Sequence, residues 1–341
     1  MRRTFSFVVI LLLAALIIPV KETPWMIDIQ NQAKAKIQAI TTQESANETA
    51  LKVPDKQDFA LNNIQMNMTK EEVEQALGKP ERVSANEYGL KWYTYHKDYH
   101  SFVMVSYMNN KVNGIYSNQN VISSKSKIKY GSPKSAVRDR LGQPIDEMTK
   151  GNYRYQITSD EYDVFDKDGI YTTVFYDKHE NNQVTGVMQI SKEMEHRLTK
   201  PYGAPSSSLA QSFEMQNFDI VNAERVQKGL SVLKYSDAIS NTARKHSKDM
   251  ADNHYFDHTN PKGESPFDRM KKDGIDYNSA GENLAYGHQN SIFAHEGLMN
   301  SEGHRKNILQ PSFKNLGVGV DFNDERQPFW TENSKCNSPL K

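Results

Sequence analysis

A thirteen-residue pattern occurs twice in the N-terminal half of this 341-residue chain, at 68–80 and again at 132–144. Each copy offers a Thr or Ser to start a helix, Val and Leu on one helical face, and a Gly-x-Pro end. Strand-like runs follow both copies, at 90–96, 102–108, 112–116, 153–157, 170–176 and 183–190. The pattern predicts two repeats, each a short helix packed on an antiparallel meander.

The first twenty residues form a separate apolar segment. Arg2 and Arg3 precede a run from residue 5 to residue 20 that is almost wholly apolar. A basic start followed by an apolar core is typical of a secretory signal or an uncleaved N-terminal anchor. No small-x-small cleavage site stands before Lys21, which favours retention in the membrane. We therefore expect an exported protein, membrane-anchored at the cell surface or secreted, with residues 21–58 as a polar spacer.

Charge and cysteine content narrow the choice of partner and compartment. Lys and Arg together equal Asp and Glu, at 42 each, so no overall field favours nucleic acid, and none is expected as a partner. Cys336 is the single cysteine, which excludes an intrachain disulfide. An exported protein without disulfides is typical of a Gram-positive-like bacterial surface. We interpret Cys336, in a polar tail, as inert.

Composition predicts two folded domains. A Pro-, Gly- and Ser-rich stretch at 199–212 indicates a linker between a repeat-built domain at 59–198 and a second domain at 213–341. The first domain has no clustered His, Cys or carboxylate set. We favour a structural or partner-docking role for it over binding of a peptide or glycan strand.

The second domain alternates helices and strands. Amphipathic spacing and capping residues predict helices at 213–227, 236–253, 265–270, 291–301 and 303–309, and strands at 316–321 and 329–333. Three short blocks lie in its last third. They are Ala-Gly-Glu-Asn-Leu-Ala at 280–285, Asn-Ser-Glu-Gly-His-Arg-Lys-Asn-Ile-Leu at 300–309, and Asn-Leu-Gly-Val-Gly-Val at 315–320, with Tyr-Phe-Asp-His upstream at 255–258.

Together these blocks resemble the CAP superfamily, the SCP or pathogenesis-related-1 type of domain, in its bacterial extracellular form. The N-terminal half resembles the CAP-associated domain that accompanies some members. The resemblance implies an α+β chain whose C-terminal half is an α-β-α sandwich with a three-stranded antiparallel core sheet. It also implies a cleft lined by His258, Glu282, Asn283 and His304, with His258 and His304 able to hold a divalent cation such as zinc.

The residues themselves leave the role of this set open. Gly281 allows a tight turn that would point Glu282 inward, but a Glu in this context also ties down loops. His304 follows Gly303 at an expected helix start, where the helix field favours a neutral ring. Aligned on the resemblance, Ser301 stands where animal members carry a second carboxylate. Glu296 and Glu302 are possible substitutes.

The sequence is compatible with three functions. We favour a binding module for a small ligand, a peptide or a cell-envelope component over an enzyme. The alternative is a hydrolase of peptide or wall material in which a His–Glu pair activates water, with or without zinc. In the third, the cleft residues are purely structural and hydrogen-bond loops together, and the N-terminal domain carries the function at the surface. The chain has no zincin His-Glu-x-x-His and no Gly-x-Ser-x-Gly.

Overall fold

The computed structural model describes residues 50–336. The expected signal or anchor at 1–20, and the spacer as far as residue 49, lie outside the described residues. Within 50–336, no helix combines the length and the apolar character needed to cross a membrane.

The two repeat helices form where the pattern predicts them. They are α3 (Lys70–Leu77) and α4 (Lys134–Leu141). Thr69 caps α3, and its hydroxyl and the Glu72 carboxylate form a reciprocal capping box. The expected Ser cap of the second copy is wrong, because Pro133 occupies the cap position and the Ser132 hydroxyl accepts from Lys129 N–H instead.

The strands of the repeats combine into one seven-stranded sheet of order β2-β3-β4-β5-β11-β10-β9. These strands are β2 (Arg82–Ala85), β3 (Lys91–Lys97), β4 (His100–Met108), β5 (Lys111–Ser117), β9 (Tyr162–Lys167), β10 (Ile170–Asp177) and β11 (Gln183–Ser191). The two meanders meet where β5 pairs antiparallel with β11. Short β1 (Phe59–Leu61) pairs with β6 (Ile122–Ser124), and η1 (Lys178–Glu180) and α5 (Lys192–Glu195) complete this half.

The second repeat differs from the prediction in one strand. The run at 153–157 forms β8 (Tyr153–Gln156), which pairs with β7 (Glu147–Lys150) in a hairpin outside the main sheet. The third strand of that meander is β9, which the pattern did not indicate. All four β8 residues are exposed, so its alternating tyrosines bury no common face.

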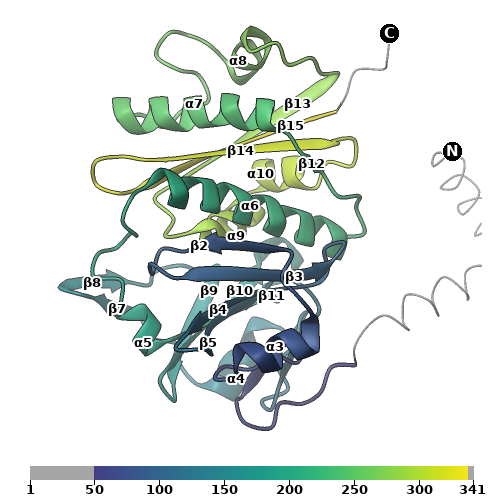
Figure 1. Cartoon of the computed structure of the whole chain (residues 1–341), viewed down its shortest axis with the longest axis vertical. Helices are drawn as coiled ribbons and strands as arrows, with labels where there is room; N and C mark the ends of the chain where they lie inside the picture. Colours follow the sequence, from purple (N-terminus) through teal and green to yellow (C-terminus); the bar gives the residue numbers. More distant parts are fainter. Residues whose placement is uncertain (1–49, 337–341) are drawn as a thin grey trace, which may run out of the picture. The chain divides into compact units, whose positions relative to one another are not determined.

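Both faces of the seven-stranded sheet are covered. One face packs under α3 and α4, with Val73 and Val137 in the shared core. On the other face, Trp92 and Tyr116 belong to a core that also contains Ile220 of the next half. The two halves therefore share a hydrophobic core. Figure 1 shows α6 and α9 lying between the two large sheets.

The C-terminal half is an α-β-α sandwich around a four-stranded sheet of order β12-β14-β15-β13. Its elements are α6 (Ser207–Gln227), β12 (Lys234–Tyr235), α7 (Asp237–Asn253), α8 (Pro266–Lys272), β13 (Ser279–Tyr286), α9 (Ser291–Asn300), α10 (Glu302–Ile308), β14 (Asn315–Phe322) and β15 (Pro328–Cys336). The antiparallel trio β14-β15-β13 matches the implied core sheet, and two-residue β12 adds a parallel edge to β14.

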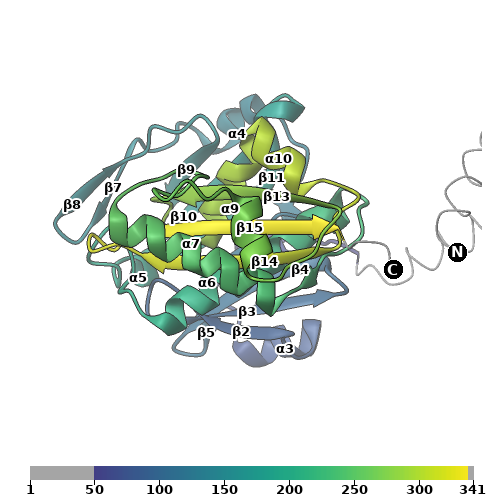
Figure 2. The same cartoon turned by 90° about the horizontal axis from the view of Figure 1, so that it is seen from above.

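The Gly-Val-Gly block of β14 has a packing reason. A Cβ on Gly317 would lie 2.3 Å from the Ser240 backbone nitrogen, and one on Gly319 would lie 2.0 Å from that of Arg244. Helix α7 therefore rests directly on the strand backbone, and it crosses over β14 and β15 in Figure 2. Larger residues at either position would push the helix off the sheet.

Two local expectations for this half need correction. Helix α6 begins at Ser207, capped by Ser206, so residues 207–212 of the expected linker are helical. Glu282 lies in strand β13 rather than at a helix cap or in a loop. The block around it has no clear alternation of polar and apolar residues, which concealed the strand.

Candidate functional site

The candidate site joins three separate elements. His258 lies in the loop after α7, Glu282 in β13, and His304 in the first turn of α10. Helix α7 ends at His254, whose φ of 54° turns the chain toward this loop. Register in the sheet fixes Glu282 opposite Asn333 of β15.

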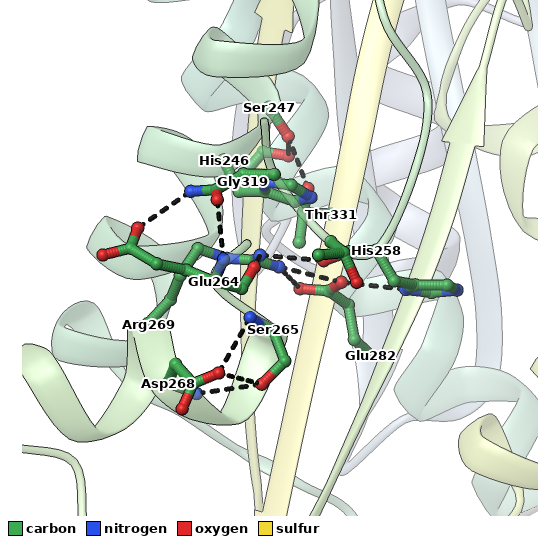
Figure 3. Close-up of polar contacts among 12 residues, drawn as sticks. His246, Ser247, His258, Glu264, Ser265, Asp268, Arg269, Glu282, Gly319 and Thr331 are labelled. Atoms are coloured by element: carbon green, nitrogen blue, oxygen red, sulfur yellow. Dashed lines mark hydrogen bonds and ion pairs between the residues drawn. The ribbon is translucent and has the colours of Figure 1, made fainter. Parts of the chain in front are cut away.

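Arg269 of α8 holds the Glu282 carboxylate. Its Nη2 donates to Oε1 at 3.0 Å and to Oε2 at 2.8 Å, and both side chains are buried (Figure 3). Its Nη1 donates to the backbone oxygens of His258 and Glu264. One guanidinium thus fixes both the acid and the loop that carries His258.

Arg269 was not among the site residues that the sequence analysis predicted. It stands thirteen residues from Glu282 on a short helix, where an arginine is ordinarily solvated. Its one local clue is the sharp start of α8, where Ser265 and Asp268 form a capping box after the Asn260 turn.

His258 completes the contacts of the Glu282 carboxylate. Its Nδ1 lies 2.9 Å from Glu282 Oε1, while half of its side chain, 51%, remains exposed. The hydrogen bond to Glu282 raises the pKa of His258 above its ordinary value, against the opposing effect of partial burial. Glu282 therefore orients the His258 ring through Nδ1, while the other half of the side chain remains open to solvent.

His304 is the second imidazole of the site. Its Nδ1 lies 2.8 Å from the Ser301 hydroxyl. Burial lowers the pKa of His304, and the positive charge of His258 lowers it further. For both rings, Nε2 has no hydrogen-bond partner among residues 50–336. Ser301, at the position of the second carboxylate in the resemblance, thus contacts the ring with a neutral hydroxyl.

Asn283 has different hydrogen-bond partners from the adjacent Glu282. It is buried, its Nδ2 donates to the His304 backbone oxygen and to Glu332, and its Oδ1 accepts from Asn307. All of these partners belong to the protein, so Asn283 fastens α10 to the sheet and thereby positions His304.

The donor set available to a metal is small. Glu282 is already bound by Arg269 and His258, which leaves Nε2 of His258 and Nε2 of His304. Zinc sites ordinarily use three or four protein ligands. In the part of the chain that the structure describes, no group of three or more His, Cys, Asp or Glu side chains is placed to hold a metal ion.

Two family models match the chain, one to each half. A CAP-associated N-terminal model matches residues 66–202, and the model of the cysteine-rich secretory protein family matches residues 218–334.

Relatives and solved structures agree with these matches. The uncharacterized membrane protein YlbC of Bacillus subtilis (strain 168) is 31% identical over 77% of this chain and 80% of its own length. The uncharacterized protein YkwD of the same organism is 46% identical over 38% of this chain and 48% of its own. An extracellular SCP-domain protein of Bacillus anthracis superposes with a TM-score of 0.70 at 26% identity, covering 85% of this chain and 99% of that one.

Proposed function

Because the chain belongs to the CAP family of cysteine-rich secretory proteins, with a CAP-associated N-terminal half, we propose that it is a ligand-binding module exported to the cell surface. Its ligand contacts the exposed edges of His258 and His304. Support for export comes from relatives described as a membrane protein and as an extracellular protein.

One observation carries the preference for binding over catalysis. Both oxygens of Glu282 accept from Arg269, and the side chain is only 2% exposed. A carboxylate in this condition cannot approach a water and take its proton, which a general base must do. Its role is to orient His258 and to keep a proton on Nδ1 of that ring. A water-activating base would then have to be Nε2 of His258, and the raised pKa of that ring favours its protonated form, which cannot accept a proton.

The two rings suit a peptide group better than a metal ion. With Nδ1 of His258 directed at Glu282, its Nε2 points away from the acid, and protonation makes that atom a hydrogen-bond donor. The lowered pKa of His304 favours the neutral ring, which can donate or accept. A carbonyl or terminal carboxylate fits His258. Two imidazole nitrogens alone would hold a divalent cation only weakly.

A peptide-binding experiment tests this proposal. A library of acetylated tetrapeptides with free and amidated C-termini is titrated into the wild-type protein and the His258→Gln plus His304→Gln variant, with isothermal calorimetry as the measurement. We expect binding by the wild type and loss of at least roughly tenfold in affinity in the variant, because two hydrogen bonds to the ligand are removed.

His254→Gln is the matched control, because His254 is an exposed histidine of the same segment and the side chains that hold Glu282 are His258 and Arg269. It should bind like the wild type. Equal affinity in the double variant would overturn the proposal. Peptide or wall-fragment hydrolysis by the wild type that disappears in the double variant would instead establish the enzyme.

A further inference from the structure

A cavity lies between the two halves, and neither His258 nor His304 lines it. Its volume is about 330 Å³, at the lower end of the range for small-molecule sites. Tyr88, Lys150 and Tyr155 line it from the N-terminal half, and His288, Phe293 and Glu296 line it from the C-terminal half. Interfaces between folded units are a common place for ligand sites.

One wall is a closed polar network. Lys150, only 3% exposed, lies 3.0 Å from Glu195 Oε1 and also bonds the Gln289 side-chain oxygen. The Tyr88 hydroxyl donates to Glu195 Oε2 at 2.9 Å and accepts from Gln289 at 3.4 Å. These four side chains come from β7, α5, the β2–β3 loop and the β13–α9 loop. Buried charges of this kind are held in place by their partners, so the wall is preorganised.

The cavity wall carries almost no net charge at neutral pH. Lys150 and Glu195 neutralise each other, and Lys178 pairs with Glu161 at 3.0 Å. Burial raises the pKa of Glu296 to about 8, which keeps its carboxyl protonated. Burial lowers the pKa of His288 to about 4, which keeps its ring neutral. A charged ligand would find no counter-charge here, and its desolvation would be uncompensated.

The cavity lining also contains aromatic rings. Phe293 lies edge-on to Tyr162, with ring centroids 5.2 Å apart, and to Phe175 at 5.4 Å. Tyr155 adds a further ring from the β7–β8 hairpin, 5.4 Å from the Lys150 ammonium. The cavity lining therefore combines aromatic rings with paired hydrogen-bonding groups.

We propose that this cavity binds an uncharged carbohydrate of one or two rings. A pyranose has an apolar C–H face that rests on aromatic rings and a rim of hydroxyl groups that donate and accept. A purely apolar ligand would leave unused the lone pairs of Glu195 and Gln289 that this network does not occupy, at a cost in affinity. The hairpin of β7 and β8, which is separate from the seven-stranded sheet, forms the outer side of the site.

The test compares sugars that differ mainly in charge. Glucose and N-acetylglucosamine are the neutral probes, glucosamine is the cation and glucuronate the anion, each followed by saturation-transfer NMR and calorimetry at pH 7. We expect saturable binding of a neutral sugar, with millimolar or tighter affinity, and at least roughly tenfold weaker binding of both charged sugars.

Two tyrosines of the same strand supply a matched pair of variants. Tyr155 lines the cavity and is 42% exposed, whereas Tyr153 is 49% exposed and does not line it. Tyr155→Ala should weaken sugar binding by roughly tenfold through loss of one stacking surface, and Tyr153→Ala should leave it unchanged. Because both side chains are largely exposed, neither change endangers folding.

Three results would overturn this proposal. They are no saturable binding of either neutral sugar at about 20 mM, equal binding of neutral and charged sugars, or equal losses in the two tyrosine variants. If the His258→Gln plus His304→Gln variant abolishes sugar binding, the sugar occupies the other site and the proposal is also wrong. Failure of the peptide experiment leaves this one unaffected, since the two sites share no residues.

Discussion

As whole residues, Glu282 and Glu296 are buried to nearly the same extent, with 7% and 6% of their surface exposed. The charges around them nevertheless have opposite signs. Glu282 is bound by the Arg269 guanidinium and by His258. Glu296 receives the Tyr116 hydroxyl at 2.8 Å but faces the carboxylates of Glu224, Asp177 and Glu161. Burial raises the pKa of Glu296 and its carboxylate neighbours raise it further, whereas Glu282 has a guanidinium within hydrogen-bond distance.

Removing the Arg269 guanidinium should have the largest effect on stability. Arg269→Met removes the guanidinium that holds the buried Glu282 carboxylate and frees the His258 loop. We expect the free energy of unfolding to fall by roughly 3–5 kcal/mol, the range for breaking a buried ion pair. Urea unfolding followed by circular dichroism measures it.

Lys272→Met is the control for that experiment. Lys272 lies on the same helix and also pairs with a glutamate, but it is 68% exposed. Its loss should change stability by about 1 kcal/mol or less. Similar losses in both variants would contradict the assignment of Glu282 as a buried charge.

The raised pKa of Glu296 predicts a pH dependence of stability of intermediate size. A carboxyl whose pKa rises from 4.5 in the unfolded chain to about 8 in the folded one binds more protons when folded. Stability then falls as pH rises between those values, by roughly 2–5 kcal/mol from Glu296 alone. Glu296→Gln removes this dependence and should make the protein more stable than the wild type at pH 9, but not at pH 5.

Thermal unfolding at both pH values measures this effect, with Glu325→Gln, an exposed acid in the β14–β15 turn, as the control. The control should follow the wild type. If Glu296→Gln loses as much stability between pH 5 and pH 9 as the wild type does, Glu296 is charged in the folded protein and the contrast with Glu282 disappears.

The smallest expected effect concerns the two imidazoles. His258→Gln removes a nearby positive charge, so the pKa of His304 should rise, while burial, its larger cause, keeps it below the ordinary value. NMR titration of the imidazole resonances reports this directly, and His254→Gln should leave it unchanged. A His304 pKa that does not move would mean that the rings are too far apart to share a ligand.

Much of the fold follows from local patterns. The repeat located α3 and α4, and the capping residues located the starts of α7 and α8 within a residue. The sequence also contains a signal of the two-sided packing of the main sheet. Residues 102–108 of β4 form a nearly unbroken apolar run, as expected for a strand covered on both faces. The pattern could not show that α6 and α9 supply the second cover.

The sequence alone indicated the family, the two repeat helices and most helices of the C-terminal half, and it singled out His258, Glu282 and His304, but it did not show strands β9 and β13. Only the tertiary structure brought Arg269 to Glu282 and opened a cavity between the halves. The physical reason is that helix caps and strand periodicity depend on a few neighbouring residues. Proximity, burial and charge state instead depend on groups that are distant along the chain.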